Sequence, residues 1–124
     1  MAEEPGWVPP GVDTKRANVA RVYDYLLGGS HHFLADQDLG RSLAAVDPNV
    51  RAIARANRDF LGRAVRFLSS AGIRQFLDIG SGIPTQGNVH EAAGPDAHVV
   101  YADIDPVAVA HSRAILAGHP NTAA

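Results

Sequence analysis

Two aspartates and a glycine turn carry the residue types in this chain that could form a ligand site. Asp78 lies at the end of an apolar run, two residues before a Gly-Ser-Gly turn at residues 80–82, and Asp103 ends a second apolar run. Glycines let a ligand approach the backbone closely, and a carboxylate can accept hydrogen bonds from both hydroxyls of a ribose. Together these features predict a site for an adenosine-bearing cofactor.

The two apolar runs are predicted strands of a parallel sheet. They are QFLDI at residues 75–79 and HVVYAD at residues 98–103. A helix is expected between them from about residue 85, and a cap-then-proline signal at residues 105–106 predicts another that runs to about Leu116. Alternating strand and helix indicate parallel strands, whose carboxyl ends place both aspartates at one edge of the sheet, where α/β proteins bind ligands.

The N-terminal part is predicted to be a flexible lead-in followed by a helical segment. Residues 1–12 contain three prolines and two glycines without periodicity, which indicates a flexible stretch. Apolar spacing within residues 13–72 predicts three helices, one from near Lys15, one over 36–45 and one over 49–70. These helices precede the sheet and can cover one side of the ligand site.

The third of these helices has two contrasting faces. Its predicted core face consists of Ile53, Phe60, Leu61, Ala64, Phe67 and Leu68. Asn57 lies within that face, where it forms either a structural bridge or a contact behind the site. Between residues 41 and 74, seven arginines stand against two aspartates. This excess is typical of a solvated helix face, partly paired through Arg55 and Asp59, and a phosphate or nucleic-acid contact is the alternative.

The composition limits the class of protein. The chain has 124 residues, a formal net charge of −2 and no cysteine. The length suits one domain, and the lack of cysteine excludes disulfides and thiolate metal sites. The net charge argues against a strongly basic nucleic-acid binder.

The sequence also lacks the signals of a membrane or secreted protein. No run approaches the ~20 apolar residues of a membrane helix, and the N-terminus lacks the layout of a signal peptide. We therefore expect a cytoplasmic protein outside the membrane.

The Gly-x-Gly turn alone does not identify the nucleotide. The dinucleotide-binding fingerprint has a third glycine where this chain has Thr85, which argues against a dehydrogenase-like site. The acidic residue before the turn points elsewhere: LDIGSG followed by VVYAD resembles the first two motifs of class I S-adenosylmethionine-dependent methyltransferases. The segments at 12–36, 55–91 and 99–116 together are similar to a bacterial family of such enzymes with no assigned substrate.

This resemblance implies an α/β fold in which a Rossmann-like parallel βαβα unit, residues 73–124, follows an N-terminal helical cap at residues 13–72. The implied cofactor is S-adenosyl-L-methionine. In that family the glycine turn passes under the methionine and adenosine parts of the cofactor, and the acidic residue after the second strand holds the ribose. The run ARVYDYLLGG implies a cap, in which Tyr23 is either a helix-packing residue or a cofactor contact. The candidate cofactor-binding residues are Asp78, Gly80, Ser81, Gly82, Asp103, Ile104 and Tyr23.

No catalytic residue and no metal site are predicted. No nucleophile–base arrangement emerges, and methyl transfer mainly requires that the acceptor and the methyl group be aligned. The adjacent His31 and His32 lack a third spaced ligand, so we expect no metal there. A small-molecule acceptor is favoured over nucleic acid because no extended basic surface is evident.

The family resemblance also predicts that the sheet is incomplete. Seven strands are usual in class I methyltransferases, and this sequence offers two, so we expect either a fragment of a longer protein or a short natural product. The second strand would then present an exposed edge and apolar surface, through which the chain could self-associate. Two hypotheses follow: the chain supplies the cofactor half-site of a methyltransferase, or it is a non-catalytic remnant acting through self-association or a partner.

Overall fold

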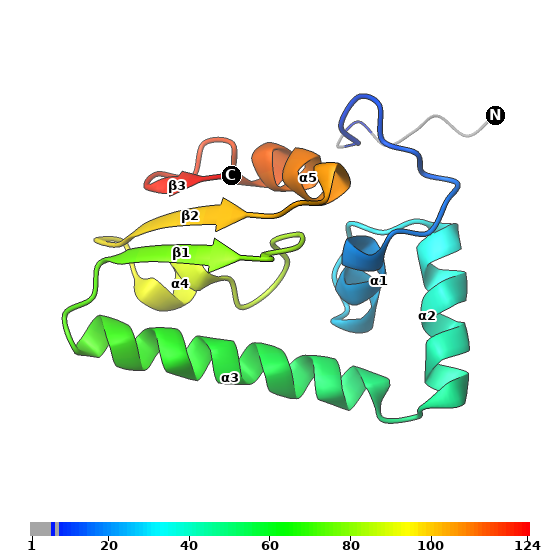
Figure 1. Cartoon of the computed structure of the whole chain (residues 1–124), viewed down its shortest axis with the longest axis horizontal. Coiled ribbons are helices and arrows are strands. Elements are labelled where there is room, and N and C mark those ends of the chain that lie inside the picture. The colour runs from blue at the N-terminus through cyan, green and yellow to red at the C-terminus, as the bar shows by residue number, and fades with distance from the viewer. Residues whose placement is uncertain (1–5, 7) are drawn as a thin grey trace.

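The computed structural model describes residue 6 and residues 8–124, so the predicted lead-in at 1–12 lies partly outside the described residues. The helices are α1 (Val19–Leu26), α2 (Leu34–Val46), α3 (Val50–Ser70), α4 (Val89–Ala93) and α5 (Pro106–Leu116). The strands are β1 (Gln75–Ile79), β2 (His98–Ala102) and β3 (Thr122–Ala123). Figure 1 shows the sheet and α5 above the long α3, with α1 and α2 beyond one end of the sheet. Within the described residues, no helix combines the length and apolar character that a membrane crossing requires.

The sheet has three parallel strands in the order β1-β2-β3. The register pairs Gln75 with His98 and Ile79 with Ala102, which brings the carboxyl ends of the two predicted strands together. β3 was not expected. It pairs with β2 through Val99 and Val100, so the prediction of an uncovered β2 edge is wrong along this part of the strand.

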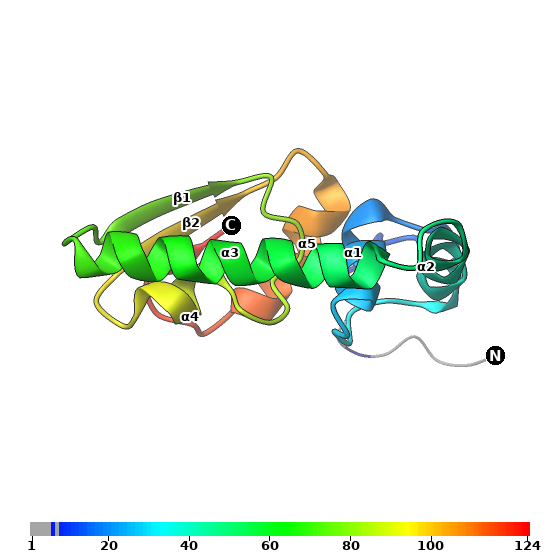
Figure 2. The same cartoon turned by 90° about the horizontal axis from the view of Figure 1, so that it is seen from below.

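One face of the sheet forms the main hydrophobic core. Its buried residues are Val65, Val89, Ala93, Ala97, Val99, Tyr101 and Leu116. Figure 2 shows β1 and β2 on one side of the molecule, with α3 and α4 on the side of this core. The other face is apolar and open, since Leu77, Ile79 and Val100 are 63%, 78% and 46% exposed.

A second core lies between α1 and α3, and it consists of Val22, Leu26, Leu27 and Ala54. α3 joins the two cores, because Ala54 belongs to this cluster and Val65 to the other. The predicted core face of α3 is largely wrong, since Ile53, Phe60 and Phe67 are 58%, 62% and 73% exposed. The helix buries Ala54, Gly62 and Val65 instead, because small residues let the neighbouring elements approach closely.

Helix α1 begins later than the sequence predicted. The expected start was near Lys15, but the helix begins at Val19 because Asn18 caps it. The Asn18 Oδ1 accepts hydrogen bonds from the N–H groups of Ala20 and Arg21, at 3.0 and 3.3 Å. These are two of the N–H groups that a helix start leaves without partners. The helix ends at Leu26, ahead of Gly28, whose φ of +78° suits a terminating glycine.

The helix after the glycine turn is also shorter than expected. A loop extends to Asn88, and α4 covers only five residues. Asn88 holds the loop, since its Nδ2 donates to the Thr85 carbonyl at 3.1 Å and to the Glu91 carboxylate at 3.0 Å. The backbone before Asn88 therefore stays irregular and borders the ligand site.

His111 of α5 makes the stability of the fold depend on pH. Its side chain is buried. Burial lowers the pKa of His111 below its ordinary value near 6.5, and the Arg21 and His31 charges lower it further against the opposite effect of Asp24 and Asp36. The unfolded chain therefore binds a proton more readily than the folded chain. This contribution to stability is complete above pH 6.5 and is lost as the pH falls below it.

We expect the free energy of unfolding to fall between pH 7 and pH 5, and a His111→Gln variant to show a shallower fall. Urea titrations at several pH values measure this. His98→Gln is the control, because His98 is exposed at the start of β2. Equal pH dependence in the wild type and the His111→Gln variant would contradict the prediction.

Candidate active site

β1 runs directly into the glycine turn. The N–H groups of Gly80 and Ser81 both donate to the carbonyl of Ala102, at 2.8 and 3.2 Å, so the turn is fastened to the end of β2. Gly80 and Gly82 have φ angles of +74° and +64°, a region that residues with side chains rarely adopt. A Cβ placed on either glycine would meet no protein atom within 4 Å. The turn therefore borders open space that a ligand can enter.

Asp103 connects the glycine turn to the loop after β2. Its Oδ2 accepts a hydrogen bond from the Gly82 N–H at 2.8 Å, and its Oδ1 accepts one from the Asp105 N–H at 2.9 Å. A carboxylate oxygen can accept more than one hydrogen bond, so both oxygens retain capacity for a ligand hydroxyl. Asp103 thus holds the glycine turn and the loop after β2 in position. The sequence had predicted only a contact with a ribose for this residue.

Asp78 adds a second carboxylate to the same edge of the sheet. Burial raises the pKa of Asp78, the Arg58 guanidinium opposes this rise, and the nearby Asp103 carboxylate raises the pKa further. Negative charge is therefore concentrated beside the glycine turn. A cationic ligand group placed there would stabilise both carboxylates.

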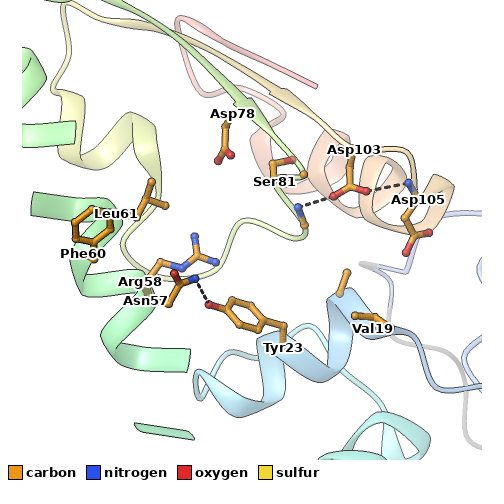
Figure 3. Close-up of a pocket in the computed structure, with 13 residues that line it drawn as sticks. Val19, Tyr23, Asn57, Arg58, Phe60, Leu61, Asp78, Ser81, Asp103 and Asp105 are labelled. Atoms are coloured by element: carbon orange, nitrogen blue, oxygen red, sulfur yellow. Dashed lines mark hydrogen bonds between the residues drawn. The ribbon is translucent and has the colours of Figure 1, made fainter. Parts of the chain in front are cut away.

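The opposite wall comes from α1 and α3. The Tyr23 hydroxyl donates to the Ala54 carbonyl at 3.3 Å and accepts from the Asn57 Nδ2 at 3.1 Å. The Arg58 guanidinium carbon lies 5.7 Å from the centroid of the Tyr23 ring. Figure 3 shows this group of side chains across an open space from Asp78 and Asp103. Asn57 is exposed, so the prediction that it is buried is wrong, but its hydrogen bond to Tyr23 forms the predicted bridge between α3 and α1.

These walls enclose a cavity of about 640 Å³, which we call the sheet-edge cavity. It is lined by Val19, Ala20, Tyr23, Asn57, Arg58, Phe60, Leu61, Asp78, Gly80, Ser81, Gly82, Asp103 and Asp105. Six of the seven candidate cofactor-binding residues are in this set. The seventh, Ile104, is 99% exposed and does not line the cavity.

Sequence reasoning missed the part of the site that comes from α3 and the start of α5. Arg58 was seen only as a member of the arginine excess, because no spacing rule relates it to a turn more than twenty residues away. Phe60 and Leu61 were assigned to the core and both line the cavity, although Leu61 also packs against the main core as predicted. Asp105 was identified as a helix cap, and its Oδ1 does accept from the Val107 N–H at 2.9 Å.

A hydrogen bond joins the start of α1 to the sheet edge. The Asn18 Nδ2 donates to the Asp105 Oδ2 at 2.8 Å, although 87 residues separate the two. The backbone N–H of Asn18 donates to the Asp36 carboxylate at 2.9 Å. One residue thus caps α1, contacts the start of α2 and holds a side chain that lines the sheet-edge cavity.

We expect Asn18→Ala to lower the free energy of unfolding by about 1–3 kcal/mol, since it removes a helix cap and a hydrogen bond to a carboxylate. Asn18→Ser retains a capping oxygen but cannot reach Asp105, so it should recover only the capping part. Urea denaturation measures both. Asn49→Ala is the control, because Asn49 precedes α3 without a side-chain capping bond. An equal loss in the Ala and Ser variants would show that capping by Asn18 contributes nothing.

A buried ion pair holds the cap helices together. The Arg21 Nε lies 3.0 Å from the Asp36 Oδ2, and the two side chains are 1% and 0% exposed. The Arg21 Nη2 also donates to the carbonyls of Asp13 and Arg16, at 3.0 and 2.6 Å. Asp36 accepts from the Phe33 N–H at 2.8 Å. The pair therefore connects α1, α2 and the segment before α1.

The two adjacent histidines have structural contacts. The His32 Nδ1 lies 2.9 Å from the buried Asp24 Oδ2, and the His31 N–H donates to the same oxygen at 2.8 Å. Gly29 must lack a side chain, because a Cβ there would overlap the Asp24 carboxylate. Among residues 6 and 8–124, no group of three or more potential ligands is placed to hold a metal ion.

Comparison with known proteins identifies the family. A family model described as S-adenosyl methyltransferase matches residues 5–124. The chain belongs to this family. The chain is similar to a provisionally assigned methyltransferase from Thermobifida fusca YX, with a TM-score of 0.84 and 51% identity over 96% of this chain and 46% of that one. It is also similar to a DUF574 family protein from Streptomyces avermitilis MA-4680, with a TM-score of 0.78 and 46% identity over 90% and 45% of the two chains.

These matches also define how much of the family fold is present. The chain spans just under half the length of either solved structure. Its three-stranded parallel sheet is accordingly an incomplete Rossmann-like fold. No curated protein matches the chain.

The sheet-edge cavity suits the cofactor that the family implies. Its volume lies within the range of about 300–1,000 Å³ that is usual for small-molecule sites. Three carboxylates, those of Asp78, Asp103 and Asp105, line it against one guanidinium. This balance suits a ligand with a cationic sulfonium and an ammonium group. The open space beside Gly80 and Gly82 leaves room for a ligand against the backbone.

Proposed function

We propose that this chain forms the S-adenosyl-L-methionine half-site of a methyltransferase, and that the methyl acceptor is a small molecule. The observation that carries the proposal is the sheet-edge cavity, which brings five sequence-predicted cofactor residues at the carboxyl ends of two parallel strands together with a sixth, Tyr23 of α1. When bound, the cofactor supplies a methyl group already activated by its positively charged sulfur. The protein must then mainly bind, orient and exclude water.

Each wall of the cavity has a role in this proposal. Asp103 accepts hydrogen bonds from the ribose hydroxyls, and Asp78 faces the aminoacyl end of the cationic cofactor, near its ammonium group. The glycine turn lets the ligand lie against the backbone. Tyr23, whose hydroxyl is held by two hydrogen bonds, offers a fixed apolar ring from the cap. No residue is assigned as a general base.

Calorimetric titration with S-adenosylhomocysteine tests this function. We expect saturable one-site binding to the 124-residue chain and no comparable binding of NADH. Thermal unfolding gives a second readout, since a ligand that binds only the folded state raises the midpoint temperature. A folded chain that does not bind S-adenosylhomocysteine would exclude an independent half-site, and tighter binding of NADH would favour a dehydrogenase-like site.

The open sheet face favours a second candidate function. Leu77, Ile79 and Val100 lie exposed on one face of the sheet, and surfaces of this kind serve as association sites. In this alternative the chain is a non-catalytic remnant that associates with a second copy through this face. It predicts a concentration-dependent oligomer in analytical ultracentrifugation and no thermal stabilisation by S-adenosylhomocysteine.

A further inference from the structure

A second cavity lies on the other side of Arg58. It has a volume of about 430 Å³ and is lined by Leu27, Arg55, Arg58, Asp59, Gln86 and Gly87. These residues come from the end of α1, the middle of α3 and the loop that follows the glycine turn. We call it the arginine cavity. Because Arg58 lines both cavities, a ligand in the arginine cavity would lie beside a ligand in the sheet-edge cavity.

The side chain of Arg58 lies near Tyr23 of α1 and near Gly87 of the loop after the glycine turn. Its Cγ and Cδ lie 3.5 and 3.8 Å from the point where a Cβ on Gly87 would be, so the absence of a side chain at Gly87 leaves space beside the Arg58 stem. Its guanidinium lies near the Tyr23 ring. Within the described residues it forms no ion pair with a carboxylate within 4 Å. Arg58 is therefore half-buried between the two cavities, and no salt bridge in the described residues neutralises its charge.

The other arginines of the local excess separate into two groups. Arg41, Arg51 and Arg74 donate hydrogen bonds within the protein. Arg55, by contrast, makes no hydrogen bond or ion pair in the described part of the chain, and the predicted pairing with Asp59 is absent there. Arg55 lines the arginine cavity one helical turn from Arg58. What distinguishes Arg55 and Arg58 from the other arginines of the excess is that they line a cavity.

The two cavities have opposite charge. Three aspartates and one arginine line the sheet-edge cavity, whereas two arginines and one aspartate line the arginine cavity. Two guanidinium groups suit a carboxylate, which arginine binds through paired hydrogen bonds. Asp59 disfavours a group with more than one negative charge. A nucleic acid would require an extended basic surface, which two arginines do not provide.

We propose that the arginine cavity binds the carboxylate of the small-molecule methyl acceptor. This inference rests on the proposed function, because it places the acceptor beside the cofactor. The cationic donor occupies the negatively charged cavity, and the anionic acceptor occupies the positively charged one. Arg58 stands between them and contributes to both, whereas Arg55 serves only the acceptor.

Nuclear magnetic resonance of the 15N-labelled chain tests this proposal, with benzoate as the probe and neutral benzamide as its matched control. We expect benzoate to shift the amide signals of Gln86 and Gly87 saturably, while benzamide does not. Arg55→Ala should weaken benzoate binding at least tenfold and leave S-adenosylhomocysteine binding unchanged. Arg55 is exposed, so the variant should fold. Arg63→Ala is the control, because Arg63 is exposed on the same helix and lines neither cavity.

Each result has a defined meaning. Saturable benzoate binding that is weakened by Arg55→Ala but not by Arg63→Ala supports the proposal. Absence of saturation, equal weakening by both variants, or tighter binding of inorganic phosphate than of benzoate would overturn it. A chain that binds S-adenosylhomocysteine but not benzoate refutes this inference alone. A chain that binds benzoate but not S-adenosylhomocysteine refutes the proposed cofactor function and with it the assignment of the anion as an acceptor.

Discussion

Asp36→Ala is expected to lower the free energy of unfolding by about 3–5 kcal/mol, because it leaves the buried charge of Arg21 without its carboxylate partner. Both side chains are almost fully buried, at 1% and 0% exposure. The variant also removes the acceptor for the N–H groups of Asn18 and Phe33. For a domain whose total stability is typically about 5–15 kcal/mol, this is a large fraction. Urea denaturation followed by circular dichroism measures the loss.

A double variant separates the ion pair from its surroundings. Arg21→Met with Asp36→Leu should be less destabilised than the sum of the two single variants, since no unpaired charge remains buried. The exposed pair of Arg41 and Asp38 is the control. Both residues lie on α2, and the Arg41 Nη1 is 2.7 Å from the Asp38 Oδ1. Even so, Asp38→Ala should change the free energy of unfolding by at most about 1 kcal/mol. Strictly additive losses at Arg21 and Asp36 would disprove the coupling.

Asp103→Ala is expected to weaken binding of S-adenosylhomocysteine roughly 10- to 150-fold, the equivalent of about 1.5–3 kcal/mol for a hydrogen bond to a charged group. The variant removes the proposed acceptor for the ribose hydroxyls. It also releases the N–H groups of Gly82 and Asp105, which the carboxylate now holds. Isothermal titration calorimetry measures the change in affinity, with Asp96→Ala as the control because Asp96 is exposed, precedes β2 whereas Asp103 follows it, and does not line the sheet-edge cavity.

Ser112→Ala distinguishes the two roles of Asp103. The Ser112 hydroxyl donates to the Gly82 carbonyl at 3.1 Å, so it supports the same turn without lining the sheet-edge cavity. We expect this variant to retain most of the affinity. If Ser112→Ala weakened binding as much as Asp103→Ala, Asp103 would act through the turn and not through contact with the ligand.

The sequence contained enough information to predict the sheet edge of the site. Asp78 and Asp103 each end a short apolar run, and parallel pairing brings such ends together irrespective of the rest of the fold. Gly80 and Gly82 were singled out because glycine lets a ligand approach the backbone, and both border open space in the structure. The cap-then-proline signal at Asp105 correctly located the start of α5.

Features that depend on tertiary packing were not predicted. α3 carries two adjacent apolar stripes, one with Phe60 and one with Ala54 and Val65, and periodicity cannot say which stripe meets the rest of the chain. The start of α1 was missed because several residues before it could cap a helix, and Asn18 prevails through its contact with Asp105. β3 was missed because its two residues are too few to form a recognisable strand pattern.

The hydrogen bond between Asn18 and Asp105 has a consequence for how the chain forms during synthesis. The two residues are 87 positions apart, so at roughly 5–20 residues per second a ribosome makes the second about 4–17 s after the first. The apolar contacts of α1 with α3 need only residues made much earlier. The cap helices can therefore assemble on the nascent chain while the sheet-edge cavity still lacks one wall. A ligand of that cavity can stabilise the chain only after β2 and the start of α5 have emerged from the ribosome.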